Sequence, residues 1–83
     1  MSKAEDVWAR LRDVIRDFFD EPELEIVEGT VASDVEGWDS LTNIELMIEI
    51  ERAFGVRFRT GELAELESVG ALAQLIERHL EGR

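Results

Sequence analysis

The spacing of apolar residues restricts this chain to a helical fold. Three stretches, residues 3–19, 40–54 and 69–80, repeat apolar side chains at intervals of three and four. That spacing matches 3.6 residues per helical turn, whereas a half-buried strand needs strict alternation. The sequence therefore predicts three substantial amphipathic helices.

The connections complete the predicted architecture. Between residues 20 and 38 the periodicity stops, and Leu24, Ile26 and Val31 are the apolar residues that could pin this stretch across the helix ends. Long ordered loops of this kind often carry function. Residues 60–66 predict a brief third helix, and Ser68 is the expected cap of the last one. We expect an all-α four-helix bundle, with three longer helices, one short helix and a long ordered loop between the first two.

Length and charge narrow the class of protein. A chain of 83 residues has room for one core, so residues 1–83 are expected to form a single domain. The formal net charge of −11 disfavours nucleic acid and anionic membranes and favours partners with a basic surface. The chain has no cysteine and no apolar stretch near the roughly 18 residues of a membrane span. We expect a cytoplasmic monomer.

The start of the second helix carries the most specific signal. Asp39 stands where an N-cap belongs, and Gly55 is placed to end the helix in a left-handed conformation. Ser40 then lies in the first turn, beside unpaired backbone N–H groups and the positive end of the helix dipole. Because such a position favours a phosphate group, we predict that Ser40 carries a covalently attached phosphate-containing arm.

The second helix has two apolar faces. At 100° per residue, Leu46, Met47 and Ile50 share one side, with Ala53 and Phe54 beside them. The nearly opposite side holds Leu41, Ile44 and Ile48, bordered by Glu45 and Glu49 on one edge and by Glu51 on the other. One interpretation is a central helix that the other helices cover on both sides. The other is a docking strip for partner proteins, or one wall of a cleft that shelters an apolar cargo.

Enzymatic and metal-binding interpretations find little support. A nucleophilic Ser40 would need a base, and His79 is the only histidine, in no recognisable triad context. Counting Asp34 as the first position of a calcium loop puts Asp39 where a glycine is required. We therefore expect no catalytic residue and no metal site.

The residues from Gly37 to the C-terminus resemble the acyl carrier protein family in its broad sense. That family places Asp-Ser-Leu at the start of the second of four helices, after a long loop. The matching residues here are Asp39-Ser40-Leu41, Ile44-Glu45-Leu46, Ile48, Ile50, Phe54, Val56 and Phe58. The chain is thus similar to a stand-alone phosphopantetheine-binding carrier domain.

The resemblance implies a function. Ser40 would receive 4′-phosphopantetheine from coenzyme A through a phosphopantetheinyl transferase, with Asp39 helping to present it. The arm's thiol would hold a fatty acyl, polyketide or aminoacyl group as a thioester. The resemblance also implies partner enzymes that load or transfer that group and carry basic docking patches. The implied recognition surface is Leu41, Ile44, Glu45 and Ile48, with Glu49 and Glu51 as supporting acids.

Some residues depart from the family pattern. Many carriers of fatty acid synthesis have an acid directly after Asp-Ser-Leu, where this chain has Thr42 and Asn43. Arg52 interrupts the acidic run of the second helix, and Trp38 is more typical of specialised stand-alone carriers. These differences leave the cargo open. The alternative function is a small acidic helical protein-interaction module with no prosthetic group.

Overall fold

Helices make up the regular structure of this protein. The computed structural model describes residues 3–59, 61–62 and 66–82, and of residues 3–5 it describes the backbone alone. Within that part of the chain the elements are α1 (Lys3–Phe18), a 3-10 helix η1 (Ala32–Asp34), α2 (Ser40–Phe54) and α4 (Val69–Glu81). The predicted all-α class is confirmed. The predicted short helix over 60–66 falls largely on residues outside the described part.

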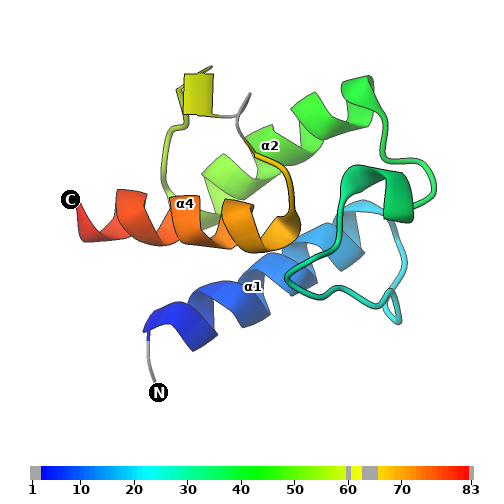
Figure 1. Ribbon diagram of the computed structural model, residues 1–83, viewed down its shortest axis with the longest axis horizontal. Helices are drawn as coiled ribbons and strands as arrows, with labels where there is room; N and C mark the ends of the chain where they lie inside the picture. The colour runs from blue at the N-terminus through cyan, green and yellow to red at the C-terminus, as the bar shows by residue number, and fades with distance from the viewer. Residues whose placement is uncertain (1–2, 60, 63–65, 83) are drawn as a thin grey trace.

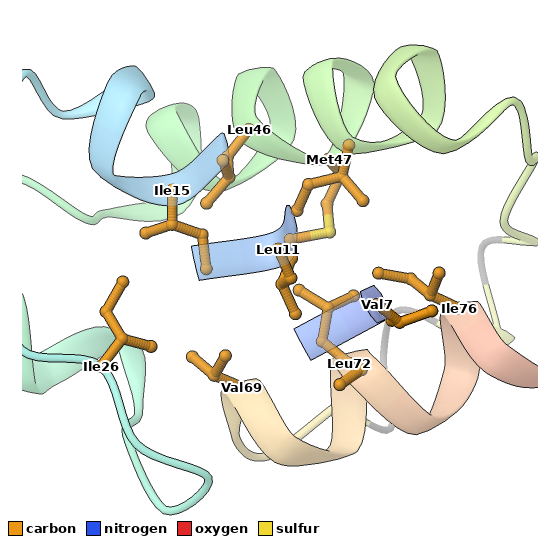
Figure 2. Close-up of a cluster of buried hydrophobic side chains, with 11 residues drawn as sticks. Val7, Leu11, Ile15, Ile26, Leu46, Met47, Val69, Leu72 and Ile76 are labelled. Carbon is orange, nitrogen blue, oxygen red and sulfur yellow. The ribbon is translucent and has the colours of Figure 1, made fainter. Parts of the chain in front are cut away.

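The three long helices share one core. α1 packs against both α2 and α4, and Figure 1 shows it running beneath them. Leu11 and Ile15 of α1 are completely buried, as are Leu46 and Ile50 of α2 and Ile76 of α4. Figure 2 shows Leu11 at the centre of this cluster, with α2 on one side and α4 on the other. Burying such side chains stabilises the fold by about 1.5–3 kcal/mol each.

The caps of α2 lie where the sequence predicted them. Asp39 is the N-cap, and Gly55 ends the helix with φ of 67°. Side chains other than glycine rarely adopt that left-handed conformation, so Gly55 allows the chain to leave the helix at this point. α1 ends at Phe18, one residue before the predicted end.

The loop from residue 19 to 39 is fastened at several points. Ile26 is buried in the core beside α4, as expected, and Leu24 is half-buried. The carbonyl oxygen of Leu24 accepts a hydrogen bond from Arg16 Nε at 2.8 Å. Two features were not predicted, namely the turn η1 and the burial of Val35. The loop is therefore part of the packed structure.

The loop also covers the beginning of α4. The N–H groups of Val69 and Gly70 donate to the carbonyl oxygens of Thr30 and Glu28, both at 2.8 Å. Thr30 itself is buried, and its hydroxyl accepts from the N–H of Val27 at 2.9 Å. A Cβ added at Gly70 would lie 2.8 Å from the oxygen of Glu28, so only glycine permits this approach. None of the helices in the described residues is long and apolar enough to cross a membrane.

Candidate functional site

Ser40 is the first residue of α2 and lies exposed at the surface. Among the described residues, no group forms a hydrogen bond with its hydroxyl. The serine oxygen is therefore available to an enzyme that approaches from solvent. This placement agrees with the prediction that Ser40 is an attachment point, which itself stays a prediction.

Asp39 organises the first turn of α2. Its Oδ1 accepts hydrogen bonds from the N–H of Leu41 at 3.0 Å and of Thr42 at 2.9 Å. In return, the hydroxyl of Thr42 accepts from the N–H of Asp39 at 2.8 Å, which completes a reciprocal capping box. The same hydroxyl lies 2.8 Å from the carbonyl oxygen of Gly37, to which it donates. The turn that presents Ser40 is held from both sides.

These bonds change the expected role of the helix N-terminus. The hydrogen bond from the Thr42 N–H is the main cause that lowers the pKa of Asp39 below its ordinary value of 3.8, so this carboxylate is charged at neutral pH. The Asp39 carboxylate already accepts from the two first-turn N–H groups that were expected to bind a phosphate on Ser40. A group attached to Ser40 would then extend into solvent beside the cap. The dipole still favours its negative charge.

Trp38 and Asn43 tie the loop to α2 next to this turn. The indole Nε1–H of Trp38 donates to Asn43 Oδ1 at 2.9 Å. The Trp38 ring also packs against Phe19, with 5.7 Å between ring centroids. Sequence reasoning treated Thr42 and Asn43 only as departures from a family pattern. The Asp-x-x-Thr spacing was a signal for the capping box, whereas nothing in the sequence pairs Asn43 with Trp38.

The outer face of α2 is open. Leu41, Ile44 and Ile48 are 65%, 60% and 48% exposed, and Glu45 and Glu49 beside them are exposed as well. The interpretation that other helices cover both faces of α2 is therefore wrong for these three residues, while Leu46, Met47 and Ile50 on the inner face are buried. The exposed residues form an apolar strip with an acidic edge, which we call the outer strip.

Glu51 differs from the other predicted acids of this surface. It is half-buried, and its Oε2 accepts a hydrogen bond from the N–H of Phe58 at 2.8 Å. This carboxylate therefore fixes the segment that follows α2. Glu49 forms an exposed ion pair with Arg52 at 3.3 Å, an interaction that contributes little to stability.

His79 has partners of its own, away from the start of α2. Its Nε2 lies 3.0 Å from Glu62 Oε1, and its ring makes an edge contact with Phe58 at 5.5 Å between centroids. Because His79 is the only histidine in the chain, Ser40 has no imidazole available as a base. The site offers an accessible hydroxyl on a turn that the capping box holds.

The start of α2 thus combines an exposed serine, a capped helix end and an open apolar strip. Comparisons with known proteins show the family of this chain. Residues 9–76 match the family described as "Phosphopantetheine attachment site". The chain is 34% identical to an acyl carrier protein of Rickettsia bellii, over 95% of this chain and 92% of that protein. It is 26% identical to an acyl carrier protein of Thermotoga maritima, over 96% and 99% of the two chains.

A solved structure shows the same fold. The solution structure of a holo acyl carrier protein from Geobacter metallireducens superposes with a TM-score of 0.83 at 33% identity, covering 88% of this chain and 84% of that one. This protein belongs to the acyl carrier protein family, whose members carry 4′-phosphopantetheine as a covalent prosthetic group. Ser40 fits that group, since attachment requires a free oxygen and open space around it, and its exposed hydroxyl has no hydrogen-bond partner in the described part of the chain.

Proposed function

We propose that this protein is a stand-alone carrier that holds an acyl group as a thioester on a 4′-phosphopantetheine arm attached to Ser40. The observation that carries the proposal is the exposed hydroxyl of Ser40 at the start of α2, within the matched residues 9–76. The cargo is a fatty acyl, polyketide or aminoacyl group. Membership in a family with a covalent arm argues against an interaction module that lacks a prosthetic group.

The carrier itself supplies no catalytic group. The thioester is reactive by its own chemistry, and partner enzymes provide bases and oxyanion-stabilising donors. Residues 39–43 keep the attachment point rigid through the capping box and the Trp38–Asn43 hydrogen bond. Tethering raises the effective concentration of the cargo at each docked partner.

Partner enzymes dock on the outer strip in this proposal. Leu41, Ile44 and Ile48 supply apolar contact area close to Ser40, and Glu45 and Glu49 supply charge complementary to a basic patch. Charge steering speeds encounter, while a small apolar contact keeps the complex short-lived. Glu51 supports this surface indirectly, because its carboxylate holds the neighbouring segment at Phe58. The net charge of −11 favours a monomer with basic partners.

Intact mass spectrometry tests the attachment. Incubating the unmodified protein with coenzyme A and a broad-specificity phosphopantetheinyl transferase should add about 340 Da, the mass of the phosphate-linked arm. Ser40→Ala should show no gain. Ser33→Ala is the matched control, because Ser33 is also exposed and should leave loading unchanged.

The same assay tests the docking surface when it is run as initial rates. Ile44→Ala should slow loading by roughly tenfold if a buried contact of 1–2 kcal/mol is lost, with little change in stability. A wild-type protein that gains no mass, or Ser40→Ala protein that does, would overturn the attachment. Unchanged rates in Ile44→Ala protein would remove the outer strip from the proposal.

A further inference from the structure

A groove lies between α1 and α2, beside the acidic edge of the outer strip. Val14 and Phe18 of α1 and Ala53 of α2, all half-buried, supply its apolar lining. Asp17 of α1 and Glu49 of α2 are exposed and complete the lining. The groove has a volume of about 360 Å³ and opens to solvent. It therefore combines an apolar surface with one carboxylate from each helix.

Helical spacing brings these side chains together. Val14 and Phe18 are four residues apart and lie on one face of α1, and Glu49 and Ala53 have the same spacing on α2. α1 packs against α2, as Figure 1 shows. Glu49 follows Ser40 by about 14 Å along the helix axis, at 1.5 Å per residue. An enzyme that binds the Ser40 turn through an interface of about 800 Å² on each side reaches that far.

The two carboxylates of the groove are open to a new cation. In the described part of the chain, Asp17 forms no ion pair. Glu49 pairs with Arg52 at 3.3 Å, but the Arg52 side chain is 74% exposed, and such surface pairs contribute little to stability. A competing cation can therefore replace Arg52 at small cost. Because both carboxylates border an apolar surface of low dielectric constant, their negative potential is focused in the groove.

Arg10 shows how a guanidinium fits between these two helices. It lies one turn before Val14 on α1, and its Nη2 donates to the carbonyl oxygen of Ala53 at 2.9 Å. The guanidinium also lies over the ring of Phe54, 5.7 Å from the centroid. Arg10 is thus engaged at the C-terminal end of α2, and it leaves the carboxylates of the groove to another cation.

We infer that this groove receives one arginine side chain of the phosphopantetheinyl transferase that loads Ser40. The aliphatic stem covers the three apolar residues, as long basic side chains do when their charged head stays in water. The guanidinium donates to Asp17 and Glu49 together, since its planar group of five N–H donors can serve two carboxylates, whereas a lysine ammonium is a compact point charge. At about 30 Å³ for each water-sized group, the groove has room for one such side chain.

This inference rests on the proposed attachment at Ser40 and extends the recognition surface from α2 to α1. Asp17 becomes a specificity-determining residue on a helix outside the outer strip. An enzyme that places an acidic side chain at this point meets two like charges and binds less well.

Loading kinetics test the role of Asp17. The broad-specificity transferase loads wild type and Asp17→Asn from coenzyme A over a range of carrier concentrations, and intact mass follows the product. We expect Asp17→Asn to raise the KM for the carrier about fivefold at low salt, through loss of a charge-assisted hydrogen bond. The kcat should change by less than about twofold, because the contact lies away from the reacting atoms. Salt screens exposed charges, so at 0.5 M NaCl the KM difference should fall below about twofold.

Two further variants separate the groove from general effects of charge. Asp13→Asn is the matched control, because Asp13 is also an exposed aspartate of α1 and does not line the groove. Long-range steering would change both variants equally. Ala53→Leu keeps both carboxylates and fills the groove, so it should raise the KM as well. Asp17→Asn decides the matter alone if Ala53→Leu does not fold.

Each result decides one way. A KM for Asp17→Asn equal to that of wild type overturns the inference, and so does an equal rise in Asp13→Asn or a loss confined to kcat. Sedimentation tests whether a second copy of this chain fills the groove instead. A wild-type dimer that Asp17→Asn dissociates would overturn the inference. Failure of the proposed attachment looks different, because no variant would then gain mass.

Discussion

The first N–H groups of α2 and of α4 find their hydrogen-bond acceptors in different parts of the chain. Each helix starts with backbone N–H groups that have no partner within the helix. At α2 the partner is adjacent in sequence, since the Asp39 carboxylate accepts from Leu41 and Thr42. At α4 the partners are distant, since Thr30 and Glu28 supply two carbonyl oxygens and Ser68 Oγ adds only the bond to Ala71 at 3.2 Å.

The local cap of α2 and the remote cap of α4 have different consequences for the surface around each helix start. A locally capped start needs nothing packed over it, so Ser40 and the outer strip stay exposed to solvent. A start that is capped by a remote loop holds that loop in place, and the loop in turn positions Trp38 beside Ser40. One helix start presents the site, and the other supports it.

Replacing Gly70 should have the largest effect on stability, because it breaks the remote contact. In Gly70→Ala the new Cβ would lie 2.8 Å from the Glu28 oxygen and 3.0 Å from its Cβ, so the loop must shift. We expect a loss of about 1–3 kcal/mol, although alanine ordinarily favours a helix by about 1 kcal/mol. Urea unfolding of wild type and Gly70→Ala measures this loss in the free energy of unfolding.

The matched control for this change is Gly29→Ala. No atom lies within 4 Å of a Cβ at Gly29, so stability should change by less than about 0.5 kcal/mol. If Gly70→Ala is as stable as the control, the loop does not depend on its contact with α4.

Removing the local cap should have an intermediate effect. Asp39→Ala leaves the N–H groups of Leu41 and Thr42 without their acceptor, which should cost about 1 kcal/mol and lower Tm by about 4–8 °C. Ser68→Ala removes a single acceptor while the loop carbonyls remain, so its loss should be smaller. Asp39→Asn keeps an acceptor and should fall within a few tenths of wild type. A greater loss in Ser68→Ala than in Asp39→Ala would contradict this ranking.

Acid should produce the smallest effect. The pKa of Asp39 is lower in the folded state than its ordinary value of 3.8, chiefly because of the hydrogen bond from the Thr42 N–H. Its charge therefore stabilises the fold above that value, and the contribution is lost as pH falls through the lower folded pKa. The Tm advantage of wild type over Asp39→Asn should shrink below about pH 4. An advantage that stays constant from pH 6 to pH 3 would contradict the assignment.

The sequence predicted the elements that local signals define. Asp39 and Gly55 mark both ends of α2, and Ser68 marks the start of α4, because capping depends on residues at the helix ends themselves. The position of Ser40 in the first turn of α2 could be predicted for the same reason. The arc of Leu46, Met47 and Ile50 identified the buried face of α2 through helical periodicity alone.

Features that depend on distant contacts could not be predicted. The loop binds α4 through the carbonyl oxygens of Glu28 and Thr30. Because every residue has a backbone carbonyl, the sequence does not indicate which ones form such contacts. The turn η1 has three residues, too few for a period to show. Whether Leu41, Ile44 and Ile48 were covered depended on how the other helices pack, so periodicity left two interpretations that only the structure could separate.

The remote capping of α4 also has a consequence for the order of folding. The Asp39–Thr42 box joins neighbours and can close as soon as α2 nucleates, since a short loop loses little entropy on closing. Val69 and Gly70 must wait until the chain has brought residues 28–30 back to them, and such non-local pairings form slowly. We expect the serine-bearing turn to be native early and the hydrogen bonds between the loop and α4 to form last.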